Sequence, residues 1–190
     1  MASYFVISGV TPKAIANSIA WYIRSKSQPS IDEIFFITSS KDGRTSEGYS
    51  NEIVLSAVDI LTDSLRILSP DSIDEIKINQ NDPIFIPEAN IPLSIKRIVK
   101  GIIERTSRGS EVVIDTTTGR KSMSGAAIVA GMNLHHKHMR KVWISYYWLH
   151  DYSPESLSKK IWELSLDEAE TVVVGVDKID DELAEINENH

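Results

Sequence analysis

The run from Asp115 to Lys121, with the sequence DTTTGRK, concentrates groups that could hold an anion. Threonine hydroxyls, backbone N–H groups beside a glycine and two cations all offer hydrogen bonds or positive charge, and a following helix N-terminus adds its dipole. A phosphate suits this set; the alternative is a solvated turn with incidental cations. The P-loop spacing is absent, so we do not expect ATP hydrolysis on that pattern. The candidate ligand-binding residues of this run and the helix after it are Thr116, Thr117, Thr118, Gly119, Arg120 and Met123.

A second candidate for anion binding follows the first apolar run of the chain. Ser8 offers a hydroxyl, Gly9 a flexible backbone, and Thr11 with Pro12 the N-cap and first turn of a helix. Gly9, Val10, Thr11 and Pro12 are therefore candidate ligand-binding residues. The alternative is an ordinary strand-to-helix turn in which Thr11 only caps. The dinucleotide fingerprint G-x-G-x-x-G is missing.

Two further clusters are weaker candidates. His135, His136 and His138 lie among cations, but a metal site needs a further ligand, and cations that close a helix C-terminus explain the cluster more simply. We therefore expect no metal and no cofactor. The aromatic residues Trp143, Tyr146, Tyr147 and Trp148 could stack a base, although an aromatic-rich edge or dimer surface is the simpler interpretation. No catalytic triad, paired-carboxylate group or H-E-x-x-H motif is present.

The elements that must position these residues alternate between apolar runs and helical periodicity. Six strands are expected, with helices between them and a polar loop over residues 39–48. Pro83, Pro87 and Pro92 are expected to interrupt regular structure, and Asn90 to cap a helix. The expected strands are residues 4–8, 31–38, 73–78, 111–115, 141–147 and 171–176. The expected helices are residues 12–26, 51–68 and 122–134, one after Asn90 and a short one from Ser153.

This alternation predicts an α/β fold: a Rossmann-like, about six-stranded, mainly parallel sheet with helices on both faces. Residues 1–176 form the expected domain, and residues 177–190 an acidic C-terminal tail or frayed helix. Ligands of such sheets bind outside the carboxyl ends of the strands, which is where both candidate loops fall.

The composition limits the class of ligand. The net charge is −7, yet residues 91–141 carry an excess of seven positive charges. A local positive region on an acidic protein suits a compact anion better than a long nucleic acid. The absence of cysteine excludes disulfides, and the absence of a signal peptide and of any long apolar run predicts a cytoplasmic protein without a membrane partner.

At these two loops the sequence resembles the CARF domains, the CRISPR-associated Rossmann-fold sensors of cyclic oligoadenylates. The resemblance is carried by residues 8–12 (SGVTP) and residues 115–127 (DTTTGRKSMSGAA), and it covers about residues 4–176. It implies a homodimer that binds cyclic tetra- or hexa-adenylate across its two-fold axis. The chain ends near Val176 with only the acidic tail, so we expect the stand-alone ring-nuclease type, which switches off type III CRISPR signalling, and cyclic tetra-adenylate as the ligand.

The resemblance also implies a metal-independent reaction in which a ribose 2′-hydroxyl attacks the adjacent phosphorus. Lys121 is the candidate for stabilising charge on the phosphorane oxygens, and Ser8 for orienting the 2′-hydroxyl or a phosphate oxygen. Two alternatives remain: a CARF sensor that leaves the ring intact, with its effector in a partner or a removed segment, and an ordinary Rossmann-like nucleotide or sugar-phosphate enzyme.

Overall fold

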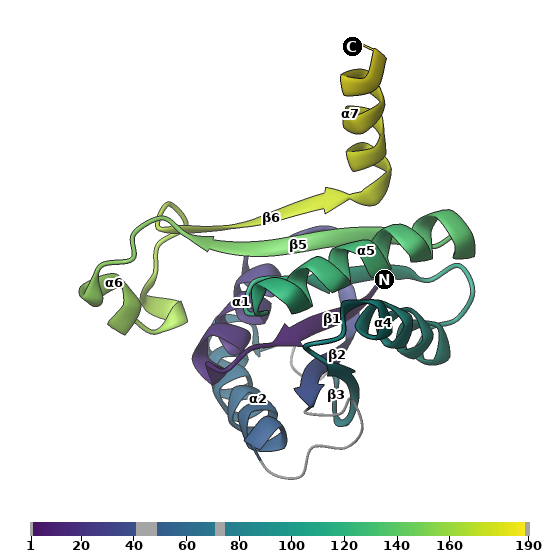
Figure 1. The fold of residues 1–190 in the computed structure, drawn as a ribbon. Helices are drawn as coiled ribbons and strands as arrows, with labels where there is room; N and C mark the ends of the chain where they lie inside the picture. Colours follow the sequence, from purple (N-terminus) through teal and green to yellow (C-terminus); the bar gives the residue numbers. More distant parts are fainter. Residues whose placement is uncertain (1, 41–48, 71–74, 189–190) are drawn as a thin grey trace.

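The computed structural model describes residues 2–40, 49–70 and 75–188, and within them six strands form one sheet in the order β3-β2-β1-β4-β5-β6 (Figure 1). β1 to β5 are parallel to their neighbours, and β6 runs antiparallel to β5. The expected Rossmann-like, mainly parallel α/β fold is therefore confirmed. The strands are β1 (Ala2–Ser8), β2 (Ile31–Ser40), β3 (Lys77–Pro87), β4 (Glu111–Asp115), β5 (Lys141–Leu149) and β6 (Ala169–Gly175).

The central strands are apolar along their whole length because helices cover both faces of the sheet. Every residue of β1 is buried, and its alternate side chains enter two separate cores. On one face α1 (Pro12–Arg24) and α2 (Tyr49–Leu68) pack against Tyr4 and Val6. On the other, α4 (Ile91–Arg105) and α5 (Lys121–His138) pack against Phe5 and Ile7.

The helix starts differ from one another in how they are capped. Asn90 caps α4 as expected, since its side chain accepts a hydrogen bond of 3.1 Å from the backbone N–H of Leu93. Ser153 caps the short α6 (Pro154–Ser158) in the same way, and the 3₁₀ turn η1 (Ile161–Glu163) follows. Thr11 stands at the N-cap position of α1 and Pro12 begins the helix, as expected, although the Thr11 side chain makes no capping hydrogen bond.

The third strand is later and longer than the sequence indicates. It spans Lys77–Pro87 rather than residues 73–78, of which 73 and 74 lie outside the described residues. Of the loop expected over residues 39–48, Ser39 and Ser40 belong to β2, and residues 41–48 lie outside the described residues. Pro83 and Pro87 fit because β3 is an edge strand and its register with β2 shifts between Phe35 and Ile37, where Asn79 and Ile84 are the partners. A proline lacks the ladder N–H but is tolerated at an edge or a bulge.

Of the two forms expected for the C-terminal residues, a tail or a frayed helix, the structure shows a helix, α7 (Val176–Glu188), which follows β6 directly and stands away from the sheet (Figure 1). Val176 is fully buried in the core under α4 and α5, so it fixes the first turn of the helix. None of the helices in the described residues is long and apolar enough to cross a membrane.

Candidate functional site

Both candidate loops lie where the strand order reverses. From β1 the chain builds outward to β2 and β3, and it then returns to place β4 on the other side of β1. The carboxyl ends of β1 and β4, at Ser8 and Asp115, therefore form the switch point at which ligands of open α/β sheets bind. α1 and α5 both begin just after these ends, so two helix N-termini point toward the same region.

The two loops are tied to each other through Thr118. Its hydroxyl donates to the carbonyl of Ile7, while the backbone N–H of Gly9 lies 3.4 Å from the same Oγ1. The backbones approach so closely that a Cβ on Gly9 would lie 1.9 Å from the carbonyl oxygen of Thr118. Glycine is required at position 9 because no side chain fits there.

A buried carboxyl fixes the start of the β4 loop. Asp115 has no exposed surface and accepts hydrogen bonds from the Tyr4 hydroxyl (2.9 Å) and from the backbone N–H (2.8 Å) and hydroxyl (2.5 Å) of Thr117. Thr117 in turn accepts from the backbone N–H of Tyr147 at 2.8 Å. Burial raises the pKa of Asp115 above its ordinary value, and burial together with the nearby Asp115 raises that of Tyr4. This network is internal and leaves Thr117 no free hydroxyl proton.

A small pocket of about 50 Å³ opens at the end of β1. At roughly 10–15 Å³ for each water-sized group, this volume takes a few such groups and no nucleoside. The Ser8 side chain lines it, and its Oγ is buried without a hydrogen-bond partner in the part of the chain that the structure describes. The lining residues are Ser8, Gly9, Val10, Thr38, Ser39, Ile53, Arg120 and Met123.

The two cations of the β4 loop have different surroundings. Arg120 lines the pocket and forms an ion pair of 2.7 Å with Glu88, which lies just after β3. Lys121 is the first residue of α5; it is exposed, forms no ion pair within residues 2–40, 49–70 and 75–188, and is not part of the pocket wall. Of these two cations, the one in the pocket wall, Arg120, is therefore already paired, whereas Lys121 is unpaired within the described residues and lies outside the wall.

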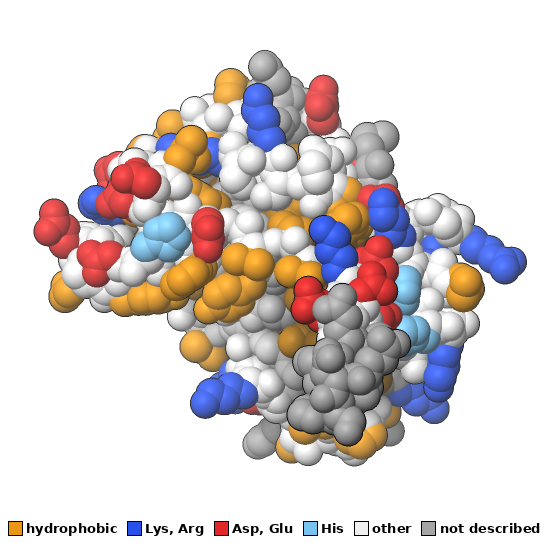
Figure 2. Space-filling model, turned by 90° about the horizontal axis from the view of Figure 1, so that it is seen from above, with side chains coloured by type: hydrophobic (Ala, Val, Ile, Leu, Met, Phe, Trp, Pro, Cys, Tyr) orange, Lys and Arg blue, Asp and Glu red, His pale blue; other side chains and the backbone are white. Residues whose placement is uncertain are grey.

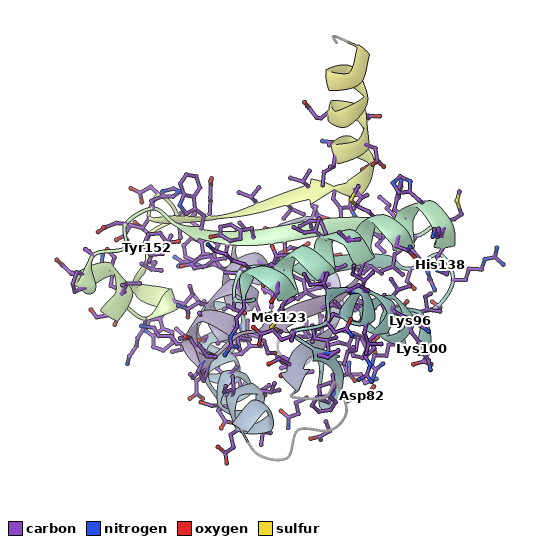
Figure 3. The ribbon with its side chains drawn as sticks, viewed as in Figure 1. Asp82, Lys96, Lys100, Met123, His138 and Tyr152 are labelled. Carbon is purple, nitrogen blue, oxygen red and sulfur yellow. The ribbon has the colours of Figure 1, made fainter. Side chains whose placement is uncertain are left out.

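The structure thus divides the expected site residues into groups. Ser8, Gly9, Val10, Arg120 and Met123 meet at the pocket, and Figure 3 labels Met123 at the start of α5. The Thr116 hydroxyl donates to the carbonyl of Ser145 at 3.2 Å, so all three threonines are engaged in holding the loop. Gly119 lies against Ile7 and Ser124, and Thr11 and Pro12 form the start of α1 outside the pocket wall.

Three residues of the pocket were not expected from the sequence. Thr38 and Ser39 close β2, and Ile53 comes from α2. Thr38 and Ser39 could have been predicted from the expected pairing of neighbouring parallel strands, because β2 pairs with β1 and Thr38 lies directly opposite Ser8. Nothing in the sequence pattern places Ile53 at this point.

Of the expected aromatic group, Tyr146 and Trp148 are exposed, whereas Trp143 and Tyr147 pack toward the core under α1. Val172 lies opposite Tyr146 on β6 and is exposed as well. Opposite residues of an antiparallel pair share a face, and this face is the one that α5 partly covers. These three exposed residues, Tyr146, Trp148 and Val172, form what we call the β5–β6 patch; Figure 2, seen from the β6 side, shows hydrophobic side chains gathered there.

Comparison with known proteins finds this fold in a solved structure, although no sequence match is found. No protein-family model and no curated protein matches the sequence. Among solved structures, the chain is similar to "Enterococcus italicus Csm6 bound to cyclic hexa-2'-fluoro-hexa-dAMP", with a probability of 1.00, a TM-score of 0.58 and 11% identity. The match covers 92% of this chain and 42% of the Csm6 chain, so this chain spans less than half the length of that protein. The six-stranded Rossmann-like α/β fold is therefore shared with a part of Csm6.

Proposed function

We propose that this protein binds a cyclic oligoadenylate at the carboxyl edge of its sheet, with the pocket at Ser8 holding a phosphate. The observation that carries the proposal is the buried Ser8 hydroxyl, which has no hydrogen-bond partner among the described residues and lies in a pocket beside the starts of α1 and α5. A buried polar group without a partner costs about 1–3 kcal/mol, which a ligand oxygen would recover. The Csm6 structure, which shares the fold, is bound to a cyclic hexanucleotide, and this supports the ligand class.

The ligand would lie between two copies of the chain. A pocket of about 50 Å³ takes one phosphoryl group, so the remainder of a nucleotide ring must rest on other surfaces. A ring of identical nucleotides is symmetric, and a two-fold dimer presents each contact twice. The β5–β6 patch supplies exposed apolar surface for such a contact, since exposed Tyr and Trp side chains are typical of interfaces. We propose cyclic tetra-adenylate as the ring.

The proposed reaction is cleavage of the ring without a metal. The 2′-oxygen of one ribose attacks the adjacent phosphorus and the bond from phosphorus to the 5′-oxygen breaks. A 2′,3′-cyclic phosphate forms, and the proton lost by the 2′-hydroxyl ends on the 5′-oxygen. Lys121, the exposed cation at the N-terminus of α5, would stabilise the phosphorane oxygens, and Ser8 would hold the phosphate or the attacking hydroxyl.

A second function, binding without cleavage, is favoured by the composition of the pocket wall. Among the residues that the structure describes, its lining includes no histidine and no carboxylate. The buried carboxyl beside it, Asp115, accepts hydrogen bonds from Tyr4 and Thr117 and so is unsuited to act as a base. A ring held without a general base is cleaved slowly, or only bound.

The experiment mixes the full chain with cyclic tetra-adenylate or cyclic hexa-adenylate and measures binding by calorimetry and products by mass spectrometry. Cleavage predicts linear di-adenylate with a 2′,3′-cyclic phosphate. Lys121→Ala should then slow cleavage on the order of 10²–10³-fold while binding weakens much less. Lys178→Ala, which removes an exposed cation on α7, is the control and should change neither. Tight binding with the ring recovered intact establishes the binding function, and no binding of either ring overturns both.

A further inference from the structure

The C-terminal end of α5 carries a cluster of side chains that the phosphate pocket does not use. His135 and His136 close the last turns of the helix, and Asp180 of α7 lies against both. The Nε2 atom of His136 is 3.3 Å from Asp180 Oδ1, and that of His135 is 3.9 Å from Asp180 Oδ2. All three potential ligand atoms lie within 4.8 Å of one another.

The orientation of His135 is fixed by the turn that ends α5. Met139 adopts a left-handed conformation (φ 51°, ψ 38°), which turns the chain so that the carbonyl of Arg140 lies 3.0 Å from His135 Nδ1. A carbonyl only accepts, so Nδ1 carries the proton and the lone pair of the neutral ring is on Nε2, facing Asp180. Metal-binding histidines are oriented in this way, with the second ring nitrogen donating to a carbonyl or carboxylate.

The carbonyl that orients His135 is itself held in place. The Arg140 side chain is buried and donates to the backbone carbonyls of Thr106 and Ser107, at the end of α4. The C-terminal turn of α5 is therefore anchored to a second helix.

Asp180 is positioned by the start of α7. Val176 is fully buried in the core that α5 covers, and Asp180 follows four residues later on the same helix face. The first turn of α7 is thus fixed by the core, and its next turn presents a carboxylate to the two histidines.

We propose that His135, His136 and Asp180 form a binding site for one divalent transition-metal ion, with Zn²⁺ preferred over other metals. Two imidazole nitrogens and one carboxylate oxygen are a donor set typical of zinc, with water as the fourth ligand. Ligands about 2.0–2.2 Å from a tetrahedral ion lie roughly 3.3–3.6 Å apart. The 3.3 Å between His136 Nε2 and Asp180 Oδ1 already has this spacing. His135 Nε2 is 3.9 Å from the other carboxylate oxygen, Oδ2, and the three ligand atoms spread over up to 4.8 Å, so the side chains must close by about 1 Å to hold one ion. The oxygen-rich, six- to eight-coordinate sites of Ca²⁺ and Mg²⁺ are a poor match.

The metal would link α7 to the body of the domain and would have no part in the phosphate chemistry. His135 is fourteen residues from Lys121 along α5, which at 1.5 Å per residue is about 21 Å. Figure 3 shows this separation, with Met123 and His138 labelled at opposite ends of the helix. The inference therefore uses residues that the proposed function does not.

The test uses the full chain, freed of metal with a chelator that is then removed, and titrated with ZnCl₂ by calorimetry and by competition with a coloured zinc chelator. We expect one Zn²⁺ per chain and an increase in Tm with added zinc. His136→Gln and Asp180→Asn should each weaken binding tenfold or more. The matched control is His138→Gln, an exposed histidine on the same helix outside the cluster, which should leave binding unchanged.

Two outcomes would overturn the proposal. One is the absence of zinc binding at 100 µM total metal, a generous concentration for a site of three protein ligands. The other is equal weakening by His136→Gln and His138→Gln, which would mean nonspecific binding to surface histidines. Ring binding and cleavage are measured in parallel with and without EDTA; an unchanged ring reaction beside a zinc-dependent Tm separates the metal site from the proposed function.

Discussion

Asp115 places a carboxyl among apolar strands at the point where the site begins. β4 lies between β1 and β5, and the carboxyl is held by Tyr4 on one side and by Thr117, itself bound to Tyr147, on the other. The hydrogen bonds favour the charged carboxyl and burial disfavours it; burial is the larger effect and the pKa is raised. The titration of Asp115 should therefore contribute to the pH dependence of the free energy of unfolding.

The sign of that dependence follows from proton linkage. An unfolded Asp titrates near 3.9, and Asp115 in the folded protein titrates higher, so between these values the folded protein binds more protons. The free energy of unfolding contributed by Asp115 therefore falls as pH rises through this interval and is level above it. Asp115→Asn does not titrate. We expect the difference in unfolding free energy, wild type minus Asp115→Asn, to decrease as pH rises from about 3.5 toward neutrality in urea titrations.

Other carboxyls cancel in this difference. Glu168, whose pKa the hydrogen bond from Lys159 lowers to about 2, loses its stabilising contribution as pH falls, but it does so equally in both proteins. A difference that stays constant or increases with pH would show that Asp115 is not the raised carboxyl.

The residue types of the site could be predicted from the sequence, but the directions of the side chains could not. The sequence does not distinguish the three consecutive threonines, yet the Thr117 hydroxyl donates a hydrogen bond to Asp115 and the Thr118 hydroxyl donates one to the carbonyl of Ile7. Direction in a turn depends on backbone angles that the tertiary contacts set. Ser8 was found because strand ends are predictable from apolar runs, and Thr38 was missed because its place depends on the pairing of β2 with β1.

At the scale of elements, the site depends on the contact between the β1–α1 turn and the β4–α5 loop. Gly9→Ala would place a Cβ 1.9 Å from the Thr118 carbonyl oxygen, so one loop must move. Overpacking of this kind typically costs about 1–3 kcal/mol. We expect Gly9→Ala to lower the free energy of unfolding by that amount and to weaken ring binding, measured by urea unfolding and calorimetry.

The matched control is Gly125→Ala, in the second turn of α5. A Cβ at this position has no atom within 4 Å, and alanine favours a helix over glycine by about 0.5–1 kcal/mol. This variant should be as stable as the wild type or more so. If Gly9→Ala behaves like Gly125→Ala, the two loops are not in contact as described.

The errors at the element scale have a common physical cause, which is that tertiary position overrides local propensity. The prolines of β3 indicated a break in regular structure, but β3 is an edge strand, and an edge strand does not need every backbone N–H for hydrogen bonds within the sheet. Residues 177–190 are acidic and thinly apolar, which left a tail and a frayed helix as alternatives, and burial of Val176 at the start of this segment favours the helix. The contact of Asp180 with His136 depends on that helix and so was equally beyond the sequence.

At the scale of the whole molecule, the β5–β6 patch predicts the oligomeric state. We expect the wild type to sediment as a dimer at micromolar concentration, and Trp148→Glu to shift it to monomer, because a charge in a buried interface is strongly unfavourable. Ile67→Glu is the control, since Ile67 on α2 is even more exposed than Trp148 (57% against 47%) but lies outside the patch. Analytical ultracentrifugation with and without cyclic tetra-adenylate decides the matter: a wild-type monomer in both conditions contradicts the prediction.

The prolines of β3 also restrict how two sheets could meet. A strand can be continued by another chain only where its outer N–H and C=O groups are free to pair, and Pro83 and Pro87 offer no N–H at all. The shifted register beside Pro83 also interrupts the regular spacing of the groups that remain. This edge is therefore protected against self-templated aggregation, and a sheet that continues from one copy into another would have to pass through β6.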